Sequence, residues 1–346
     1  MKDKILNETD KNVDNLPEEI SEIIYYGSMA PNSHNTQLWK VSVDPEKNIM
    51  KIYLDEERTL KKVDSENREA YISIGAFTTN ILMAFEAYGY ETDLSISEID
   101  GGNVVLIKYK KLEEDNVNDE IINAIMKRHT DKRPFLNKNI NDEDIEKVID
   151  DNNVFFLKSG SESFEYIKKS TVSAMEKQAY DKNKAEEFSK WLRLSDKETI
   201  DSKDGLSAEQ LGLTGFVKSI YYLITTHESA KEDSYAKQSV DTTKKQVDGC
   251  SGFFIITGGT SDDKLIKTGM LLERTWLKAV EAGISIHPMS QALEEEPYCD
   301  EISDELNTNM PVQMVLRAGY VKEYGENNKI RRDLCDYVTV KNISLN

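Results

Sequence analysis

The sequence predicts an α+β fold, because segments with helical periodicity occur together with a strand hairpin and further short strand-like segments. Apolar residues recur every three to four positions in the helical segments, and they alternate with polar residues in most of the strand-like ones. One continuous apolar run, residues 253–257, is typical of a strand that is buried on both faces. With 346 residues, 38% of them hydrophobic and 31% charged, the chain can bury a large core as a globular protein.

The first part of the chain is predicted to form a helix and a hairpin after a frayed polar start. Residues 1–15 are polar, and a helix then begins near Pro17 and ends near Gly27, since isoleucines recur between them at helical spacing. Apolar residues alternate over 39–43 and again over 50–54, on either side of a DPEKN turn. This pattern predicts two paired strands, each half buried.

The remaining elements follow from the same two periodicities. A core helix is predicted over 71–89, where Gly89 can provide the left-handed C-terminal cap. A weakly patterned segment, 195–234, contains several glycines and could cover a site. The other predictions are a strand at 104–109, a helix at 121–126, a strand at 154–157, one or two helices over 163–192, the strand at 253–257, a long helix over 262–282, a short segment at 283–288 and a strand at 311–320.

Two of the predicted helices resemble one another in sequence. GAFTTNILMAFEAYG (75–89) and GMLLERTWLKAVEAG (269–283) both begin with glycine and end with glycine fourteen residues later. Between the glycines, apolar residues recur at helical spacing. Similar helices are common in unrelated proteins, so this echo is only a first indication of an internal duplication.

Composition and charge exclude several classes of function. The net charge of −19 disfavours a large nucleic-acid footprint and attachment to an anionic membrane. The N-terminus has no apolar signal region, and no run of about 18 apolar residues could span a bilayer, so a cytoplasmic protein is expected. Three cysteines and four histidines show no CxxC or HExxH spacing, and therefore no metal site is predicted.

Two basic clusters stand out against this acidic background. In KRHTDK (127–132), Arg128 and Lys132 supply cations and Thr130 a hydroxyl donor within one short loop, a combination that can bind a phosphate group. An alternative is a helix end at which basic residues favour the dipole. The second cluster, KIRR (329–332), could be a solvated tail.

The segment APNSHNTQLW (30–39) is rich in amides and hydroxyls between apolar ends. Such side chains are suited to neither helix nor strand interiors, but they are good donors and acceptors for the edge of a planar heterocycle. An ordinary turn rich in asparagine is the alternative interpretation.

These motifs together resemble the FMN-dependent nitroreductases. APNSHNTQLW is similar to the family signature APSxxNxQPW, and KRHTDK is similar to the family's RxS/TxK/R phosphate loop. Here the signature precedes the phosphate loop, whereas the usual order is the reverse. The order seen here resembles the Acg-type branch, in which two nitroreductase-like halves are fused in one chain and imitate the usual dimer. DEERTLKKVDSENREAYISIGA, LLERTWLKAVEAGISIHPMSQ and the ending RRDLCDYV also resemble that branch.

The resemblance implies a nitroreductase-type fold with an antiparallel-rich central sheet flanked by helices. It further implies a pseudo-dimer of a first half over residues 1–115 and a second half over 116–346, with 195–234 as a candidate lid. Such a chain would be a monomer with an internal pseudo-two-fold axis and one complete flavin site, and further dimerisation is left open.

Carried over by motif, the resemblance assigns FMN contacts to fourteen residues. Arg128, Thr130 and Lys132 would bind the phosphate and ribityl chain, joined by Lys329 and Arg331 in place of the family's KxR tail. The isoalloxazine and ribityl groups would be reached by Pro31, Asn32, Ser33, Asn35 and Gln37 from the first half, and the flavin edge would be lined by Pro288, Met289, Ser290 and Gln291. Leu38 departs from the signature proline, and Ser290 and Gln291 replace the usual acidic-glycine pair, which weakens the expected contact to N5.

The implied activity is hydride transfer from NAD(P)H through FMN to a nitroaromatic or quinone-like acceptor. The cofactor performs the electron chemistry, so no catalytic side chain is predicted. One alternative is a protein that sequesters or stores FMN under a lid with little turnover. Another is an acidic protein without a cofactor, in which the loops are purely structural.

Overall fold

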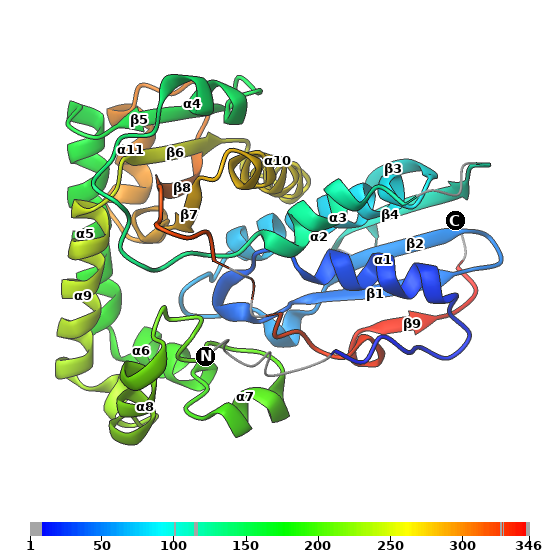
Figure 1. Ribbon diagram of the computed structural model, residues 1–346, viewed down its shortest axis with the longest axis horizontal. Coiled ribbons are helices and arrows are strands. Elements are labelled where there is room, and N and C mark those ends of the chain that lie inside the picture. The colour runs from blue at the N-terminus through cyan, green and yellow to red at the C-terminus, as the bar shows by residue number, and fades with distance from the viewer. Residues whose placement is uncertain (1–8, 100–101, 114–116, 326, 328, 344–346) are drawn as a thin grey trace.

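The computed structural model describes residues 9–99, 102–113, 117–325, 327 and 329–343, and it has the predicted α+β class. Its strands form two separate sheets with helices packed between and around them (Figure 1). Within the described part of the chain, no helix is both long and apolar enough to cross a membrane. The strands are β1 (Trp39–Asp44), β2 (Ile49–Leu54), β3 (Tyr90–Ile99), β4 (Gly102–Lys111), β5 (Val154–Lys158), β6 (Gly252–Thr257), β7 (Ser285–Pro288), β8 (Val312–Gly319) and β9 (Val338–Val340).

The five-stranded sheet has the order β3-β4-β2-β1-β9. The predicted hairpin is confirmed, because β1 and β2 pair antiparallel with Trp39 opposite Leu54. The last strand, β9, returns from the C-terminal tail and pairs parallel to β1, with Val41 opposite Val338. This sheet is therefore completed by residues that lie about three hundred positions away in the chain.

The four-stranded sheet has the order β5-β6-β8-β7 and is antiparallel throughout. All six residues of β6 are buried, as the continuous apolar run at 253–257 predicts. Strand β8 is buried along its whole length beside it. Strands β6 and β8 thus form the centre of the second sheet.

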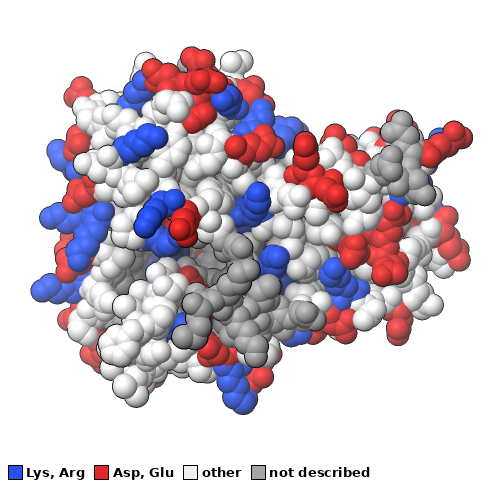
Figure 2. All heavy atoms as spheres, in the orientation of Figure 1, with Lys and Arg blue, Asp and Glu red and all other residues white. Residues whose placement is uncertain are grey.

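The helices cover both sheets, and α5 and α9 run along one side of the second sheet (Figure 1). Helices α6, α7 and α8 lie below this pair in the view of Figure 1. Figure 2 shows an uncharged area of surface at the position of α8. The helices are α1 (Glu18–Ser28), α2 (Arg68–Ala87), α3 (Asp119–Lys127), α4 (Asp142–Val148), α5 (Glu162–Tyr180), α6 (Lys182–Trp191), α7 (Asp196–Ser202), α8 (Gly215–Ile224), α9 (Asp233–Asp248), α10 (Asp262–Glu281) and α11 (Tyr298–Glu305), with short 3₁₀ turns at η1 (Ser33–Asn35), η2 (Glu56–Arg58), η3 (Ser229–Lys231), η4 (Gln291–Glu294) and η5 (Leu334–Asp336).

Helices α2 and α10 pack against one another at the centre of the molecule. Gly75 of α2 lies against the backbone carbonyl of Ile266, and Gly269 of α10 lies against the backbone carbonyl of Ile72. A methyl group at either glycine would overlap the opposing carbonyl oxygen. Glycine is therefore required at both positions for the two backbones to approach so closely.

Several elements were not predicted, because their residues bury little apolar surface. Strand β3 is an edge strand in which no described side chain is fully buried. Helix α9 buries only Ala236, Thr243 and Val247. Helices α4 and α11 and strand β9 are each eight residues or shorter, which leaves little length for a periodic signal.

Candidate functional site

A cavity of about 1000 Å³ lies where loops from both parts of the chain meet. Residues 30–35 and the first turns of α2 line one side, and residues 128–133 and 287–291 line another. Helices α5, α6 and α9 and the segment 206–214 complete its walls. The volume lies at the upper end of the range of about 300–1000 Å³ that is typical of small-molecule and cofactor sites.

Most of the residues assigned by motif line this cavity. They are Pro31, Asn32, Ser33, Asn35, Arg128, Thr130, Lys132, Pro288, Ser290, Gln291 and Arg331. The loop with the signature motif and the loop with the basic cluster are thus brought together, although about a hundred residues separate them in the chain.

Gln37, Met289 and Lys329 are not part of the cavity wall. The Gln37 side chain donates to the carbonyl of Lys203 at 2.8 Å and accepts from the backbone N–H of Arg332 at 2.8 Å. Met289 is buried in the core of the second sheet, and Lys329 is partly buried with a φ of 55°. Gln37 therefore joins the segment near 203 to the C-terminal tail.

The signature loop has a strained backbone. His34, Asn35 and Gln37 have φ values of 52°, 53° and 52°, in the left-handed region that non-glycine residues rarely adopt. Asn32 stabilises the turn by accepting from the backbone N–H of Gln37 at 2.8 Å. Each left-handed residue costs about 1–3 kcal/mol, and such strain persists at sites where a precise loop shape has a function.

Arg331 holds this loop in place through hydrogen bonds of its guanidinium group. Its guanidinium donates to the carbonyls of Ser28 and Met29 and to the side-chain oxygen of Asn35, the last at 3.3 Å. Burial lowers the pKa of Arg331 to about 10, with a further contribution from the charge of Arg128. Arg331 therefore has few donors left for a ligand and mainly positions the loop.

Arg128 is buried beside a carboxylate of α10. Its Nε atom lies 3.0 Å from Glu273, and its guanidinium carbon lies 4.8 Å from the centre of the Trp276 ring. A further nitrogen donates to the carbonyl of Met29. The Nη1 atom has no hydrogen-bond partner within the described part of the chain, so one donor of Arg128 remains for a ligand.

Lys132 differs from Arg128 because it has no carboxylate partner among the described residues. Burial alone lowers the pKa of its ammonium to about 8. A Cβ atom added at Gly212 would lie 3.3 Å from the Cβ of Lys132, so the 206–214 segment lies directly against this lysine. A cation without a counter-ion on a cavity wall is suited to an anionic group.

Two histidines on the cavity wall are held in the neutral form. Burial lowers the pKa of His34 to about 4, with a smaller effect from the charge of Lys132. Burial also lowers the pKa of His287 well below its ordinary value, and the charges of Arg317 and Lys132 add to this. The Nδ1 atom of His287 is buried without a partner in the described structure, so a polar group remains for a ligand.

Part of the segment 195–234 lines the cavity. Leu206, Leu211 and Tyr221 are among its residues that line the wall. At its base, Asp204 pairs with both Arg58 and Arg193, the latter at 2.6 Å. This double ion pair anchors the segment to η2 and to the end of α6.

A carboxyl cluster on the cavity wall was not assigned by the motifs. Glu69 at the start of α2 and Glu294 at the end of η4 both line the cavity, and Arg68 lies between them. The Arg68–Glu69 pair is part of the segment that resembles the Acg-type branch, but its side chains gain a functional interpretation only from their position.

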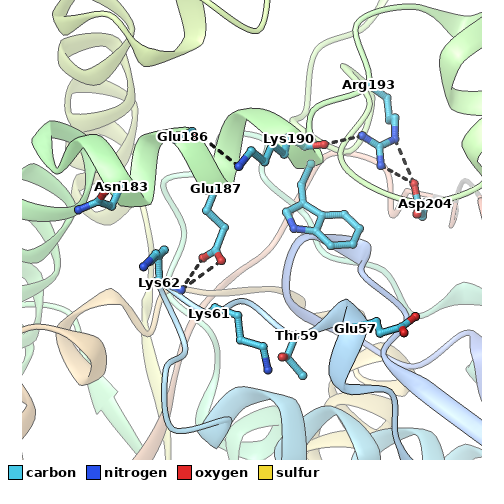
Figure 3. A pocket seen from close by; sticks show the side chains of 11 residues that line it. Glu57, Thr59, Lys61, Lys62, Asn183, Glu186, Glu187, Lys190, Arg193 and Asp204 are labelled. Atoms are coloured by element: carbon cyan, nitrogen blue, oxygen red, sulfur yellow. Dashed lines mark hydrogen bonds and ion pairs between the residues drawn. The ribbon is translucent and has the colours of Figure 1, made fainter.

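A second pocket of about 500 Å³ lies beside α6 (Figure 3), and the residues of this helix that line it differ from those that line the large cavity. Its charges are mostly satisfied within the protein, since Glu187 accepts from the backbone N–H groups of Lys62 and Val63, and Glu186 pairs with Lys190. It lacks the buried cation without a counter-ion that marks the large cavity.

Known proteins are similar to this chain in sequence and in structure. No protein-family model matches the chain. The probable NAD(P)H nitroreductase PigM of Serratia sp. (strain ATCC 39006) is 21% identical over 329 residues, which cover 90% of this chain and 91% of the relative. The crystal structure of the FMN-dependent nitroreductase NfnB from Mycobacterium smegmatis in complex with NADPH covers 59% of this chain and 88% of its own at 11% identity, with a TM-score of 0.36. The similarity to the Serratia protein spans both predicted halves and supports a relation to the nitroreductases.

Proposed function

We propose that this protein is an FMN-dependent NAD(P)H oxidoreductase of nitroreductase type with one flavin site per chain. The observation that carries the proposal is the convergence of the 30–35 loop and the 128–132 loop on one cavity, with Lys132 facing it without a counter-ion. The similarity to a probable NAD(P)H nitroreductase along almost the whole chain supports the same assignment.

The residues present fit FMN in chemistry and placement. Lys132, Thr130 and the free Nη1 of Arg128 would hold the phosphate, because charge-assisted bonds to phosphate need donors of this kind. The isoalloxazine and ribityl groups would lie against Asn32, Ser33 and Asn35 on one side and Pro288, Ser290 and Gln291 on the other. When bound, FMN supplies the hydride-transfer chemistry.

The protein's own residues have three tasks in this proposal. Arg331 and Asn32 hold the strained signature loop in place. His287 and His34 remain neutral and leave the positive charge of the site to Lys132 and Arg128. The segment 206–214 limits the entry of water, which strengthens the remaining electrostatic contacts.

We further propose that the chain belongs to the fused Acg-type branch, with a first half over 1–115 and a second half over 116–346. The equivalent contacts of Gly75 and Gly269 support an internal pseudo-two-fold axis, because a two-fold interface repeats each contact. The pairing of β9 with β1 would correspond to an exchange of the C-terminal tail between the halves. A nitroaromatic or a quinone is the proposed electron acceptor.

A second candidate function, FMN sequestration, is favoured by the anchored 195–234 segment. Asp204 fixes this segment over the cavity through two arginines, which would slow the access of nicotinamide and acceptor. Both functions require the same flavin site and differ only in turnover.

The experiment that tests both functions is an absorbance spectrum of the purified protein with identification of released flavin, followed by anaerobic addition of NADH and then NADPH. Bound FMN that is reduced on mixing and reoxidised by a quinone or nitroaromatic establishes the oxidoreductase. Bound FMN that neither nicotinamide reduces favours sequestration. Absence of flavin binding after reconstitution contradicts both.

A further inference from the structure

Two carboxyl groups from different parts of the chain meet on the wall of the cavity. Glu69 lies in the first turn of α2, and Glu294 ends η4, which directly follows the 288–291 loop. Both carboxyl groups flank the guanidinium of Arg68, and their side chains are 16% and 8% exposed. Two carboxylates beside one cation in a buried site repel one another, which favours a proton held by the pair.

The neighbouring groups balance a single negative charge. Arg68 Nη2 lies 3.2 Å from Glu69 and 3.6 Å from Glu294. Ser33 donates to Glu69, and Gln178 donates to Glu294 at 2.8 Å. One arginine beside two carboxyl groups is neutral overall when the pair holds one proton.

The pKa values of Glu69 and Glu294 are shifted in opposite directions, which agrees with this arrangement. Burial and the charge of Glu69 raise the pKa of Glu294 well above its ordinary value. Burial would also raise the pKa of Glu69, but the hydrogen bond from Glu294, the charge of Arg68 and the hydroxyl of Ser33 bring it below its ordinary value. Two carboxyl groups in contact behave in this way when they share one proton.

Charged and titratable groups lie on both sides of the Glu69–Glu294 pair. Asp64 accepts from the backbone N–H groups of Glu69 and Ala70 and raises the local negative potential, while neutral His34 lies on the Ser33 side. On the other side Glu295 is paired with Lys184, which lines the cavity. Glu69 lies nearer to Arg68 than Glu294 does and also accepts from Ser33, so Glu69 is the better stabilised carboxylate and Glu294 keeps the proton.

A second observation marks the same cavity as a ligand site. His287 is 7% exposed, lines the cavity and has a buried Nδ1 atom without a partner in the described structure. Lys132 faces the cavity without a counter-ion among the residues that the structure describes. The acidic pair and these two groups line the same cavity, and the 206–214 segment forms part of its wall.

We propose that Glu294, sharing a proton with Glu69, is the proton donor to the electron acceptor. This inference rests on the proposed oxidoreductase function. Reduction of a quinone to a hydroquinone takes up one hydride and one proton. The hydride comes from the reduced flavin, and the proton from Glu294.

In this step one O–H bond of the carboxyl pair breaks and one O–H bond forms on the acceptor oxygen. The pair is left without a proton and is stabilised by Arg68, Ser33 and Gln178. It regains its proton from water when the product leaves. Reduction of the flavin by NAD(P)H does not use the pair.

The test compares Glu294→Gln with Glu301→Gln, which changes an exposed carboxyl of α11 outside the cavity. Stopped-flow measurements on the flavin-loaded protein follow reduction by NADPH or NADH and reoxidation by a benzoquinone separately. We expect Glu294→Gln to slow reoxidation by about 10²-fold, the lower end of the usual contribution of a general acid, with flavin reduction within about twofold of wild type. Glu301→Gln should leave both steps unchanged.

An infrared spectrum of the protein at pH 7 provides a readout that does not depend on activity. All spectra are recorded in a Glu273→Gln background, because burial raises the pKa of Glu273 to about 7 and this carboxyl would contribute a band of its own. In this background the protonated carboxyl band should be present both without further change and in Glu301→Gln, and it should be lost in Glu294→Gln. Glu69→Gln should shift the band, because the proton then has a different partner. Equal slowing of both half-reactions by Glu294→Gln, or a band that this change leaves intact, would overturn the proposal.

The same data separate this inference from the proposed function. If flavin is bound and reduced but the carboxyl band is absent, only the proton-donor role is overturned. If wild type binds no flavin, the oxidoreductase function is overturned, and the donor role with it.

Discussion

Gly75 and Gly269 occupy equivalent positions in the interface between α2 and α10. Each lies against the backbone carbonyl of the residue that stands three positions before the other glycine, namely Ile266 for Gly75 and Ile72 for Gly269. In a two-fold interface each contact occurs twice with the partners exchanged. The pair of glycines therefore relates the two helices as copies of one element would be related.

Substitution of Gly75 by alanine should destabilise the protein strongly. The added methyl group overlaps the carbonyl oxygen of Ile266, and two central helices have to move apart to relieve it. Overpacking of this kind costs about 1–3 kcal/mol and more where backbone atoms oppose the new group. Denaturant unfolding of Gly75→Ala measures the loss. Glu86→Ala on the exposed face of α2 is the control and should change the free energy of unfolding by less than about 0.5 kcal/mol.

Gly269→Ala should cost a similar amount, since it makes the corresponding contact with Ile72. A large loss for one glycine and none for the other would show that the interface is not equivalent from its two sides.

The elements that were predicted from the sequence are those that bury a periodic apolar face. Helices α2 and α10 and the β1–β2 hairpin fall within a few residues of the predicted bounds. The echo between 75–89 and 269–283 identified two helices that pack on one another, although sequence similarity alone does not show contact. Strand β9 was not predicted because its three residues gain their partner, β1, only through tertiary structure.

The site was predictable where the motif is continuous in the chain. Residues 30–35 and 128–132 line one cavity as the motifs imply. The proximity of Glu69 and Glu294 was not predictable, because 225 positions separate them and each carboxyl alone is ordinary on a surface. Gln37 belongs to the signature, yet it forms its hydrogen bonds with the backbone at 203 and 332, and no local pattern shows this.

Replacement of Lys132 by methionine should weaken FMN binding without loss of stability. The ammonium has no counter-ion in the described structure, and its lowered pKa shows that the fold disfavours its charge. A bond between this charge and a phosphate contributes about 1.5–3 kcal/mol, so affinity should fall by about 10–100-fold. Titration of the flavin-free protein with FMN, followed by fluorescence, measures the change. Lys127→Met, at an exposed position before the loop, should bind as wild type does.

Unchanged FMN affinity in Lys132→Met would remove the phosphate role of this residue. A loss of thermal stability in the flavin-free variant would instead show that Lys132 has a structural partner.

Replacement of Asp204 by asparagine should loosen the segment over the cavity. Arg58 and Arg193 both lose their carboxylate partner, and hydrogen bonds to charged groups contribute about 1.5–3 kcal/mol each. Amide exchange in residues 205–214 should therefore become at least about tenfold faster than in wild type. Asp201→Asn, which removes only an exposed pair with Lys197, is the control. Turnover with a quinone should rise in Asp204→Asn if the segment limits access, and faster exchange without a gain in turnover would argue against that role.

The ionisation of Glu273 should make stability depend on pH near neutrality. Burial raises the pKa of Glu273 to about 7, and the charge of Arg128 at 3.0 Å only partly offsets this effect. The ordinary pKa of this glutamate in an unfolded chain is 4.5. The contribution of the protonated carboxyl group to the free energy of unfolding is therefore fully present below pH 4.5, and it is lost as the pH rises through 7.

Glu273→Gln retains the shape of the protonated side chain but cannot ionise. Wild type and variant should be about equally stable at pH 4.5, and wild type should lose on the order of 3 kcal/mol relative to the variant by pH 8. Denaturant unfolding of the flavin-free proteins at several pH values measures this difference. Glu281→Gln, at the exposed end of α10, should follow wild type at every pH. If the free energy of unfolding of wild type instead rises relative to that of Glu273→Gln between pH 4.5 and 8, attraction to Arg128 exceeds the cost of burying the carboxylate.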